Sequence, residues 1–89
     1  MARVKVRLVS LLRDAVGSKE VELELPEGAR LGDALRALYA SYPRLERLVA
    51  ELEKRGLAVL FLVNGEAAGR ERELRDGDVL TILPPASGG

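Results

Sequence analysis

The stretch Val79-Leu80-Thr81-Ile82-Leu83 runs directly into Pro84-Pro85-Ala86-Ser87-Gly88-Gly89, where the given sequence ends. Its first part is apolar and predicts a strand. Its second part carries no charged side chain, its two prolines fix φ and remove N–H donors, and its diglycine has no Cβ atoms. Six extended residues span about 20 Å. The stretch therefore predicts a strand followed by a slender arm, residues 84–89, with a free carboxylate at Gly89.

A terminal arm of this kind has two interpretations. Most chain ends are disordered and have no function of their own. A run of small, uncharged residues also suits insertion into a narrow channel of another protein, because glycine lets two backbones approach closely. The Gly88-Gly89 dipeptide alone leaves both interpretations open, and its context in the chain has to decide.

The composition excludes several classes of function. The 89 residues include 14 basic and 14 acidic side chains, which argues against a nucleic-acid or membrane-surface partner. The chain has no Cys and no His, so disulfides, thiolate nucleophiles, Cys/His metal sites and imidazole chemistry are excluded. No apolar run approaches the roughly 20 residues of a membrane span, and the N-terminus lacks a signal-peptide core. We expect one soluble, intracellular domain without a bound metal.

Charged and apolar residues alternate along two stretches near the N-terminus, residues 3–8 and residues 20–25. This period of two predicts two strands, each with a buried face and a charged face. Residues 11–16 break the alternation and Gly17-Ser18 predicts a turn, so we expect an antiparallel hairpin. Its opposed charges would contribute about 0.2–1 kcal/mol per pair, which favours a structural role over a binding role. The charges concerned are Arg3, Lys5 and Arg7 on one strand and Glu20, Glu22 and Glu24 on the other.

Apolar residues then recur at helical spacing in two consecutive segments. The first segment extends from Leu31 to Tyr42 and has Asp33 in its first turn, where a negative charge suits the helix dipole. Pro43 prevents simple continuation and suits the first position of a second segment, which Gly56 is placed to end. We expect one main helix and a second short helix.

Three more strands are predicted after the helices. Residues 57–63 are almost wholly apolar, as is typical of a strand covered on both faces. Asn64-Gly65 is a strong hairpin signal, with residues 66–68 as a short return strand. A turn at residues 76–78 precedes the last strand, residues 79–83. The order favours an α+β fold with a mixed sheet of about five strands. If the first and last strands are parallel neighbours, they form the centre of the sheet.

Five motifs occur in an order that spans nearly the whole chain: Leu12-Arg13-Asp14-Ala15-Val16-Gly17, residues 22–28, Val63-Asn64-Gly65-Glu66, residues 74–79 and Leu83-Pro84-Pro85-Ala86-Ser87-Gly88-Gly89. Together with the element order, they resemble the ubiquitin-like β-grasp family. Within it, the chain is similar to the MoaD/ThiS family and looks like the small sulfur-carrier subunit of molybdopterin synthase, the MoaD group. The chain departs from that group near Val9 and Leu83, where the group often has aromatic residues.

The resemblance implies a β-grasp domain, residues 1–83, and an extended Gly-Gly tail, residues 84–89. It implies that an E1-like adenylating enzyme of the MoeB type uses ATP to activate the carboxylate of Gly89, which then receives sulfur as a thiocarboxylate. The tail would insert into the large, MoaE-type subunit, which transfers sulfur to a pterin precursor. The chain would then be a non-catalytic, cytoplasmic co-substrate. No bound cofactor is expected beyond the transient glycyl-adenylate and thiocarboxylate.

The resemblance also implies two contact surfaces. The first is the tail, with contact residues Pro84, Pro85, Ala86, Ser87 and Gly88 beside Gly89. The second is an apolar patch on the sheet face away from the helices, with candidates Phe61, Leu83, Leu57, Val59 and Thr81. The predicted strands 57–63 and 79–83 are apolar on both faces, so the sequence does not show which of their residues point to the open face. Burial under residues 43–56 would explain the same apolar character. Arg13 matches a position that pairs with a partner in the family, although a solvated turn residue would look the same.

Three other functions stay open. The chain could be a sulfur carrier for thiazole synthesis or tRNA thiolation, although such carriers tend to be shorter, and residues 43–56 and the Pro-Pro pair favour the molybdopterin branch. It could be a ubiquitin-like modifier attached to lysines. It could also be a β-grasp binding module with an idle tail. The sequence leaves the sulfur donor, the oligomeric state and the docking patch undetermined.

Overall fold

Five strands and three helices make up residues 1–85, the part of the chain that the computed structural model describes. In chain order they are β1 (Ala2–Leu8), α1 (Ser10–Val16), β2 (Glu20–Leu25), α2 (Leu31–Ser41), α3 (Pro43–Lys54), β3 (Leu60–Val63), β4 (Glu66–Ala67) and β5 (Val79–Leu83). The strands form one mixed sheet in the order β2-β1-β5-β3-β4. β1 and β5 are parallel neighbours, and the other pairs are antiparallel. This confirms the predicted α+β fold of β-grasp type.

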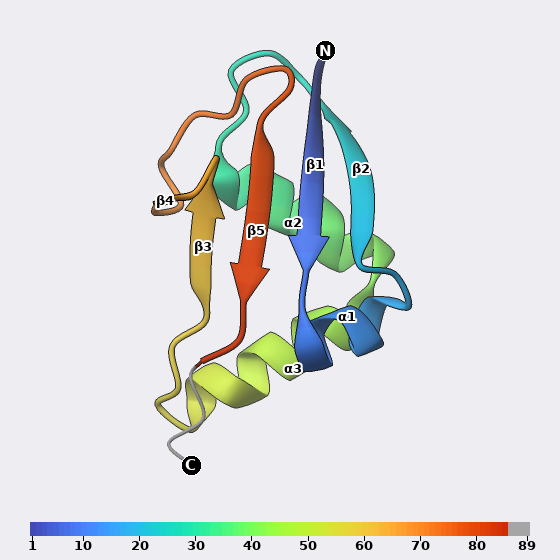
Figure 1. The fold of residues 1–89 in the computed structure, drawn as a ribbon, viewed down its shortest axis with the longest axis vertical. Coiled ribbons are helices and arrows are strands. Elements are labelled where there is room, and N and C mark those ends of the chain that lie inside the picture. Colours follow the sequence, from blue (N-terminus) through green and yellow to red (C-terminus); the bar gives the residue numbers. More distant parts are fainter. Residues whose placement is uncertain (86–89) are drawn as a thin grey trace.

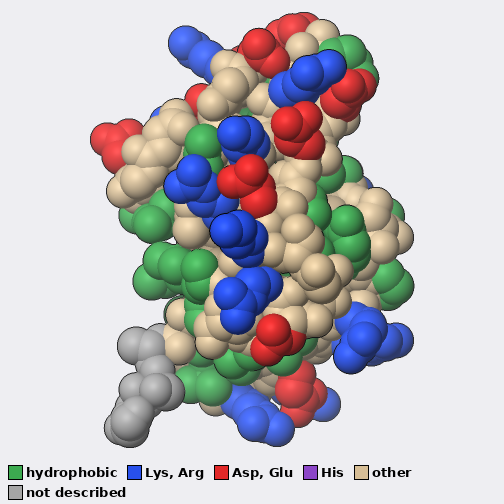
Figure 2. Space-filling model, turned by 45° about the vertical axis from the view of Figure 1, so that its right-hand side comes forward, with side chains coloured by type: hydrophobic (Ala, Val, Ile, Leu, Met, Phe, Trp, Pro, Cys, Tyr) green, Lys and Arg blue, Asp and Glu red, His purple; other side chains and the backbone are tan. Residues whose placement is uncertain are grey.

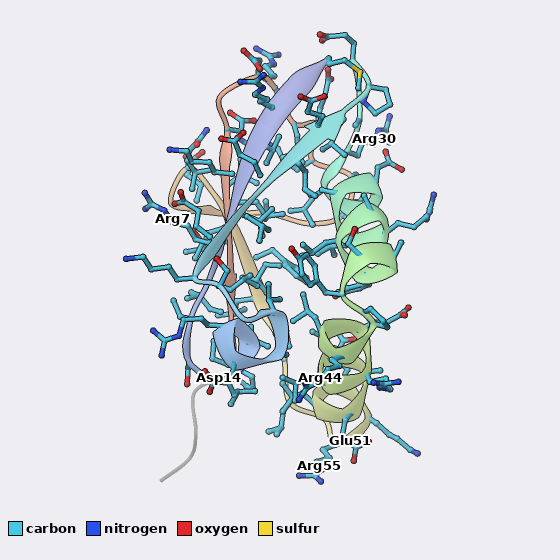
Figure 3. All side chains as sticks on the ribbon, turned by 90° about the vertical axis from the view of Figure 1, so that its right-hand side faces the viewer. Arg7, Asp14, Arg30, Arg44, Glu51 and Arg55 are labelled. Atoms are coloured by element: carbon cyan, nitrogen blue, oxygen red, sulfur yellow. The ribbon has the colours of Figure 1, made fainter. Side chains whose placement is uncertain are left out.

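The helices lie on one side of the sheet and leave its other face open. Figure 1 shows α2 crossing behind the strands, with α1 and α3 near the end where β1 and β5 stop. The core lies between the two layers, and Figure 3 shows Arg7 pointing away from it. Alternate residues of β1 are buried, as the period of two predicts. None of the helices within residues 1–85 has the length and apolar character needed to cross a membrane.

The apolar stripe of α2 supplies much of this core. Its members Leu31, Ala34, Leu35 and Leu38 are at most 1% exposed. Each buried leucine contributes about 1.5–3 kcal/mol relative to an exposed one. The carboxylate of Asp33 accepts a hydrogen bond from the backbone N–H of Arg30 at 2.9 Å, which satisfies a donor at the start of the helix. The predicted main helix is therefore confirmed.

The charges of β1 and β2 face each other on the open side, as predicted. The register places Arg3 opposite Glu24, Lys5 opposite Glu22 and Arg7 opposite Glu20. Arg3 Nε lies 3.7 Å from Glu24 Oε1, and Arg7 Nε lies 3.3 Å from Glu20 Oε2. These side chains are exposed, so solvent screening limits each pair to about 0.2–1 kcal/mol. The two strands are antiparallel, but α1 replaces the tight hairpin.

The sequence analysis does not predict helix α1. It notes only that residues 11–16 break the alternation of charged and apolar residues before the turn at Gly17-Ser18. The helix has seven residues and one buried side chain, Leu12, which is too short a segment to show a helical period. No side-chain hydrogen bond caps its start, and Ser10 has a positive φ of 55°. Gly17 ends it with a φ of 87°. The predicted turn glycine is thus also a helix terminator.

Helix α3 begins at Pro43, as predicted, but it has 12 residues against 11 in α2, so the expectation of a short second helix is wrong. Beyond its end, Gly56 has a φ of 81°. The N–H of Leu57 donates to the carbonyl of Leu52 at 3.0 Å, which closes the helix end. Because Leu57 takes part in this turn, β3 begins only at Leu60.

The predicted turn at Asn64-Gly65 connects β3 to β4 and also fixes the start of β5. Both residues have positive φ, 51° and 84°, as a two-residue hairpin turn requires. The Asn64 side-chain oxygen accepts from the N–H of Val79 at 2.9 Å, and its amide group donates to Asp78 at 2.9 Å. The turn therefore sets the register of the last strand against β3.

Candidate functional site

The end of β5 is held from both sides. Leu8 of β1 pairs with Ile82, and Leu60 of β3 pairs with Leu83. Residues 84–85, which follow directly, are half-buried prolines with fixed φ and no N–H donor. The tail therefore starts from a fixed point at one end of the sheet (Figure 1). The predicted site residues Ala86, Ser87, Gly88 and Gly89 lie outside the described residues.

An apolar patch covers part of the open face beside this point. In β5, Leu80 and Ile82 are buried while the alternate residues are half-exposed. Strand partners point to the same face, and the pairs Leu60–Leu83 and Leu62–Thr81 therefore lie on the open side. Leu60 is 52% exposed. We call this set the open-face patch: Leu60, Leu62, Thr81 and Leu83.

The structure corrects the expected placement of Phe61. Its strand partner is the buried Ile82, so Phe61 lies on the helix side and packs against the core. Val59, another candidate, is buried as well. Leu83 is on the open face, and Leu60 and Leu62 join it there although the sequence analysis did not name them. Residues 57–63 are apolar on both faces, so their sequence shows no alternation that would assign a side chain to one face. Only the pairing with β5 places Leu60 and Leu62 on the open face.

Other exposed apolar side chains lie near the same end of the sheet. β1 and β5 are parallel and both end there, whereas β3 is antiparallel and begins there. Val9 follows β1 directly, Leu11 lies in the first turn of α1, and Leu57 precedes β3; each is about 40% exposed. The root of the tail is therefore bordered by apolar surface on more than one side, which is typical of a protein-binding site.

Positive charge borders the open-face patch. β1 is the neighbour of β5, and Lys5 pairs with Val79 and Arg7 with Thr81. Across the open face the order is thus an acidic row on β2, a basic row on β1, and then the patch. In Figure 2 a column of charged side chains runs down the molecule with hydrophobic side chains on either side. A partner with an apolar centre and acidic residues at its rim would be complementary.

Arg13 is placed on α1. Its side chain is exposed, and its Nε lies 4.0 Å from the carboxylate of Asp14. Its backbone carbonyl accepts the N–H of Gly17 at 2.8 Å. Arg13 lines a surface hollow with Ser18 and Lys19 and is not part of the open-face patch. A role in partner binding stays a prediction for this residue.

The side chains of the tail root offer contact surface and no acid–base chemistry. The open-face patch consists of three leucines and one threonine, and the whole chain lacks Cys and His. Within residues 1–85, no group of three or more His, Cys, Asp or Glu side chains is placed to hold a metal. The arrangement can offer an apolar contact surface to another protein, next to the point from which residues 86–89 continue the chain.

One comparison decides the family and covers almost the whole chain. The model described as the ThiS family matches residues 6–89, from within β1 through the diglycine. The chain belongs to the ThiS family. The resemblance inferred from the motifs is thereby confirmed, and the matched region includes Gly88 and Gly89, which the structure does not describe.

This ThiS-family chain has relatives with two kinds of name. It is 36% identical over 84 residues to small archaeal modifier protein 1 of Haloferax volcanii, covering 93% of this chain and 97% of that protein. It is 32% identical over 89 residues to the molybdopterin synthase sulfur carrier subunit of Chlamydomonas reinhardtii, covering 98% and 99%.

Solved structures share the fold of this ThiS-family chain over its full length. The solution structure of small archaeal modifier protein 1 from Methanosarcina acetivorans has a TM-score of 0.82 and 35% identity, covering 100% of this chain and 98% of that one. A chain in the BexX/CysO complex of Amycolatopsis orientalis has a TM-score of 0.68 and 29% identity, covering 97% and 99%. The second example was solved as a complex.

Proposed function

We propose that this ThiS-family chain is a sulfur carrier whose Gly89 bears the sulfur as a C-terminal thiocarboxylate in molybdopterin synthesis. The observation that carries the proposal is the family match through residue 89, which includes the diglycine that follows β5. The similarity to the molybdopterin synthase sulfur carrier subunit of Chlamydomonas reinhardtii supports the molybdopterin branch. The fixed root of the tail supports a function in which the terminus is presented to other proteins.

The chemistry follows from the properties of a carboxylate. A carboxylate is a poor electrophile, so it needs a better leaving group before sulfur can attack. In the proposal, the Gly89 carboxylate attacks the α-phosphorus of ATP on a MoeB-type adenylating enzyme, which forms the acyl-adenylate and releases pyrophosphate. Hydrosulfide (HS⁻) supplied by a sulfur donor then attacks the acyl carbon, displaces AMP and loses its proton, which leaves the thiocarboxylate. We propose the cytoplasm as the location of the reaction.

Two partners would use the same surface in turn. The adenylating enzyme and the MoaE-type large subunit both have to receive the tail, so both would contact the tail root and the open-face patch. The chain itself would act as a co-substrate, in keeping with its lack of Cys and His. Similarity to a chain solved in the BexX/CysO complex supports binding to a partner protein.

The decisive experiment is intact-protein mass spectrometry after incubation with ATP, a MoeB-type enzyme and a sulfur donor. We expect a gain of about 16 Da, sulfur for oxygen, at the C-terminus. Deleting Gly89 should abolish the gain and leave the melting temperature unchanged, because a terminal residue contributes little to folding. The exposed-residue variant Arg44→Ala on α3 serves as a control and should gain the same mass. Absence of the gain in the unmodified chain would contradict the proposal.

A second candidate function is covalent attachment to lysines of other proteins. The observation that favours it is the 36% identity to small archaeal modifier protein 1 of Haloferax volcanii. Arg75 is the last basic residue, so trypsin would leave residues 76–89 attached to a modified lysine. Peptide mass spectrometry of cell extracts should find this remnant if the chain is a modifier. The remnant would be absent if the chain acts only as a sulfur carrier.

A further inference from the structure

Asn64 is the only asparagine of the sequence, and the sequence has no glutamine. It precedes Gly65, and the two residues form the exposed turn between β3 and β4. An asparagine followed by glycine is chemically labile, because a neighbour without a Cβ lets its backbone nitrogen reach the asparagine side chain. The contacts of this turn determine whether the nitrogen can do so in the folded chain.

Both ends of the Asn64 side-chain amide are hydrogen-bonded. Its Oδ1 accepts from the N–H of Val79 at 2.9 Å, and its Nδ2 donates to Asp78 Oδ1 at 2.9 Å. The backbone N–H of Asn64 also donates to the carbonyl of Val79 at 2.8 Å. A reaction at the amide carbon removes Nδ2, so the hydrogen bond to Asp78 has to break first. Local opening of the turn is therefore needed before this side chain can react.

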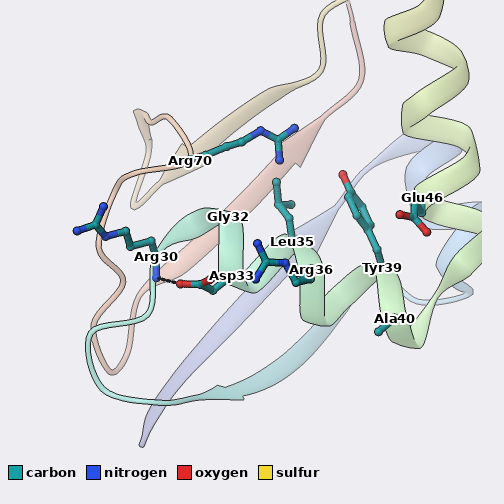
Figure 4. A pocket seen from close by; sticks show the side chains of 9 residues that line it. All are labelled: Arg30, Gly32, Asp33, Leu35, Arg36, Tyr39, Ala40, Glu46 and Arg70. Atoms are coloured by element: carbon teal, nitrogen blue, oxygen red, sulfur yellow. Dashed lines mark hydrogen bonds and ion pairs between the residues drawn. The ribbon is translucent and has the colours of Figure 1, made fainter.

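Asp78, the acceptor of that amide, is held in place by other parts of the fold. Its Oδ2 accepts from the N–H of Arg75 at 2.8 Å, and its carbonyl accepts from the N–H of Lys5 in β1 at 3.0 Å. The loop that leads to it is fixed as well, since the N–H of Gly32 donates to the carbonyl of Arg70 at 3.0 Å beside the start of α2 (Figure 4). The Asp78 carboxylate therefore stays next to the group that residue 64 presents.

We propose that Asn64 is a site of spontaneous deamidation, which the folded turn slows and which, once complete, loosens the start of β5. The backbone nitrogen of Gly65 attacks Cγ of Asn64 and forms a new C–N bond. The bond from Cγ to Nδ2 breaks, and ammonia leaves with the proton of the Gly65 N–H. Water then adds to either carbonyl of the succinimide ring, which opens to aspartate or isoaspartate. No oxidant or reductant takes part.

The product places a second carboxylate beside Asp78. An aspartate at position 64 keeps an oxygen for the N–H of Val79 but has no N–H to donate to Asp78 Oδ1, which is 2.9 Å from the present Nδ2. Two carboxylates at such a distance repel each other. Isoaspartate adds a backbone atom to a two-residue turn, which disturbs its geometry. Either product weakens the link that fixes the start of β5. The inference does not depend on the sulfur-carrier function.

The first test follows the reaction by mass spectrometry, in buffer and in urea at the same pH and temperature. Trypsin releases the peptide 56–70, in which Asn64 is the only side-chain amide, and deamidation raises its mass by about 1 Da. We expect the gain to appear at least about tenfold faster in urea, because a hydrogen bond to a carboxylate contributes about that factor. In urea, Gly65→Ala is the matched control and should react more slowly, because its methyl group hinders ring closure.

The outcomes of this test separate the two parts of the proposal. No mass gain of peptide 56–70 in urea would overturn the site itself, and so would equal rates for Gly65→Ala and the unmodified chain in urea. Equal rates in buffer and in urea would overturn the protection by the folded turn.

The second test uses Asn64→Asp, which reproduces one product. Its melting temperature should fall by about 5–10 °C, because a hydrogen bond to a charged group is replaced by repulsion. Asn64→Asp/Asp78→Asn exchanges the amide and the carboxylate, so an N–H again lies between the two residues and most of the loss should be recovered. An unchanged melting temperature of Asn64→Asp, or a double variant as unstable as the single one, would overturn the loosening of β5. If Asn64→Asp does not fold, the double variant decides: folding supports the repulsion and failure to fold overturns it.

Discussion

Leu60 of β3 and Leu83 of β5 are paired and face each other on the open side of the sheet. Leu83 directly precedes Pro84, the first residue of the tail. Leu60 is 52% exposed and Leu83 is half-buried. Any protein that receives the tail has to approach this pair, because the tail starts beside it. Removing such a pair from water favours association, and a charge placed there would oppose it. The pair is therefore the most direct place to test the docking surface.

The variant Leu60→Glu is expected to weaken binding to the proposed adenylating enzyme at least tenfold, because an unpaired carboxylate would be buried in an apolar contact. Its melting temperature should change little, since the leucine is already half in solvent. Calorimetric titration and thermal unfolding measure the two effects. Ala50→Glu, at an exposed position on α3, should bind normally. Unchanged binding by Leu60→Glu would exclude the open-face patch as the docking surface.

A second prediction concerns the charges of β1 and β2. Arg7→Glu places a carboxylate opposite Glu20 in the register, and we expect a loss of about 0.5–1 kcal/mol in the free energy of unfolding. The double variant Arg7→Glu/Glu20→Arg restores opposite charges and should recover most of the lost free energy of unfolding. Urea unfolding at low and high salt measures both, and added salt should reduce the difference. A double variant as unstable as the single one would show that the pairing contributes nothing.

A third prediction compares two glycines in different backbone conformations. Gly56 has a φ of 81°, and no neighbouring atom lies within 4 Å of the position that a Cβ would take. Gly56→Ala should therefore cost about 1 kcal/mol through backbone strain alone. Gly32 is the second residue of α2, and a Cβ there would meet Arg70 at an ordinary 3.5 Å, so Gly32→Ala should stabilise the fold by about 0.4–1 kcal/mol by reducing the entropy of the unfolded chain. Thermal unfolding should show opposite shifts, and shifts of the same sign would contradict this account.

A fourth prediction follows from Tyr39, whose pKa is raised above 10.0 chiefly by burial. Arg70 lowers this pKa, whereas Glu53 and Glu46 raise it. Between the pKa of the unfolded chain, near 10, and the higher folded value, the folded state binds more protons. The contribution of Tyr39 to the free energy of unfolding should therefore be constant below pH 10 and should fall as the pH rises above 10.

Tyr39→Phe removes this contribution and is the control for it. Urea unfolding of the unmodified protein and of Tyr39→Phe at pH 8 and at about pH 11 separates the contribution of the tyrosine from the titration of other groups. The difference in stability between the two proteins should shift in favour of the phenylalanine variant at the higher pH. A constant difference would mean that the tyrosine titrates alike in the folded and unfolded chain.

The strands with one charged face were the most predictable part of the fold. The period of two in residues 3–8 and 20–25 gives both the buried side and the opposed charges, and the register confirms them. The turn at Asn64-Gly65 is equally local, because its positive φ values need those residue types. Pro43 marks the start of α3 for the same reason. Where a backbone conformation depends on the residue itself, the sequence is sufficient.

Long-range packing explains what the sequence does not reveal. The seven residues of α1 contain a single buried side chain, and its place against the fold depends on contacts with α3. The face of Phe61 is set by its partner Ile82, which lies elsewhere in the chain. The site residues beyond Pro85 stay predictions.

The parallel pairing of β1 with β5 has a consequence for how the protein is made. Leu8 meets Ile82 in the middle of the sheet, so the earliest and latest parts of the chain have to be present together. A growing chain on the ribosome cannot complete the sheet until its final strand emerges, and such distant pairing is slow to form. An interrupted translation product lacks both the finished sheet and the tail. A product that stops before β5 therefore lacks the paired strand end from which residues 84–85 continue.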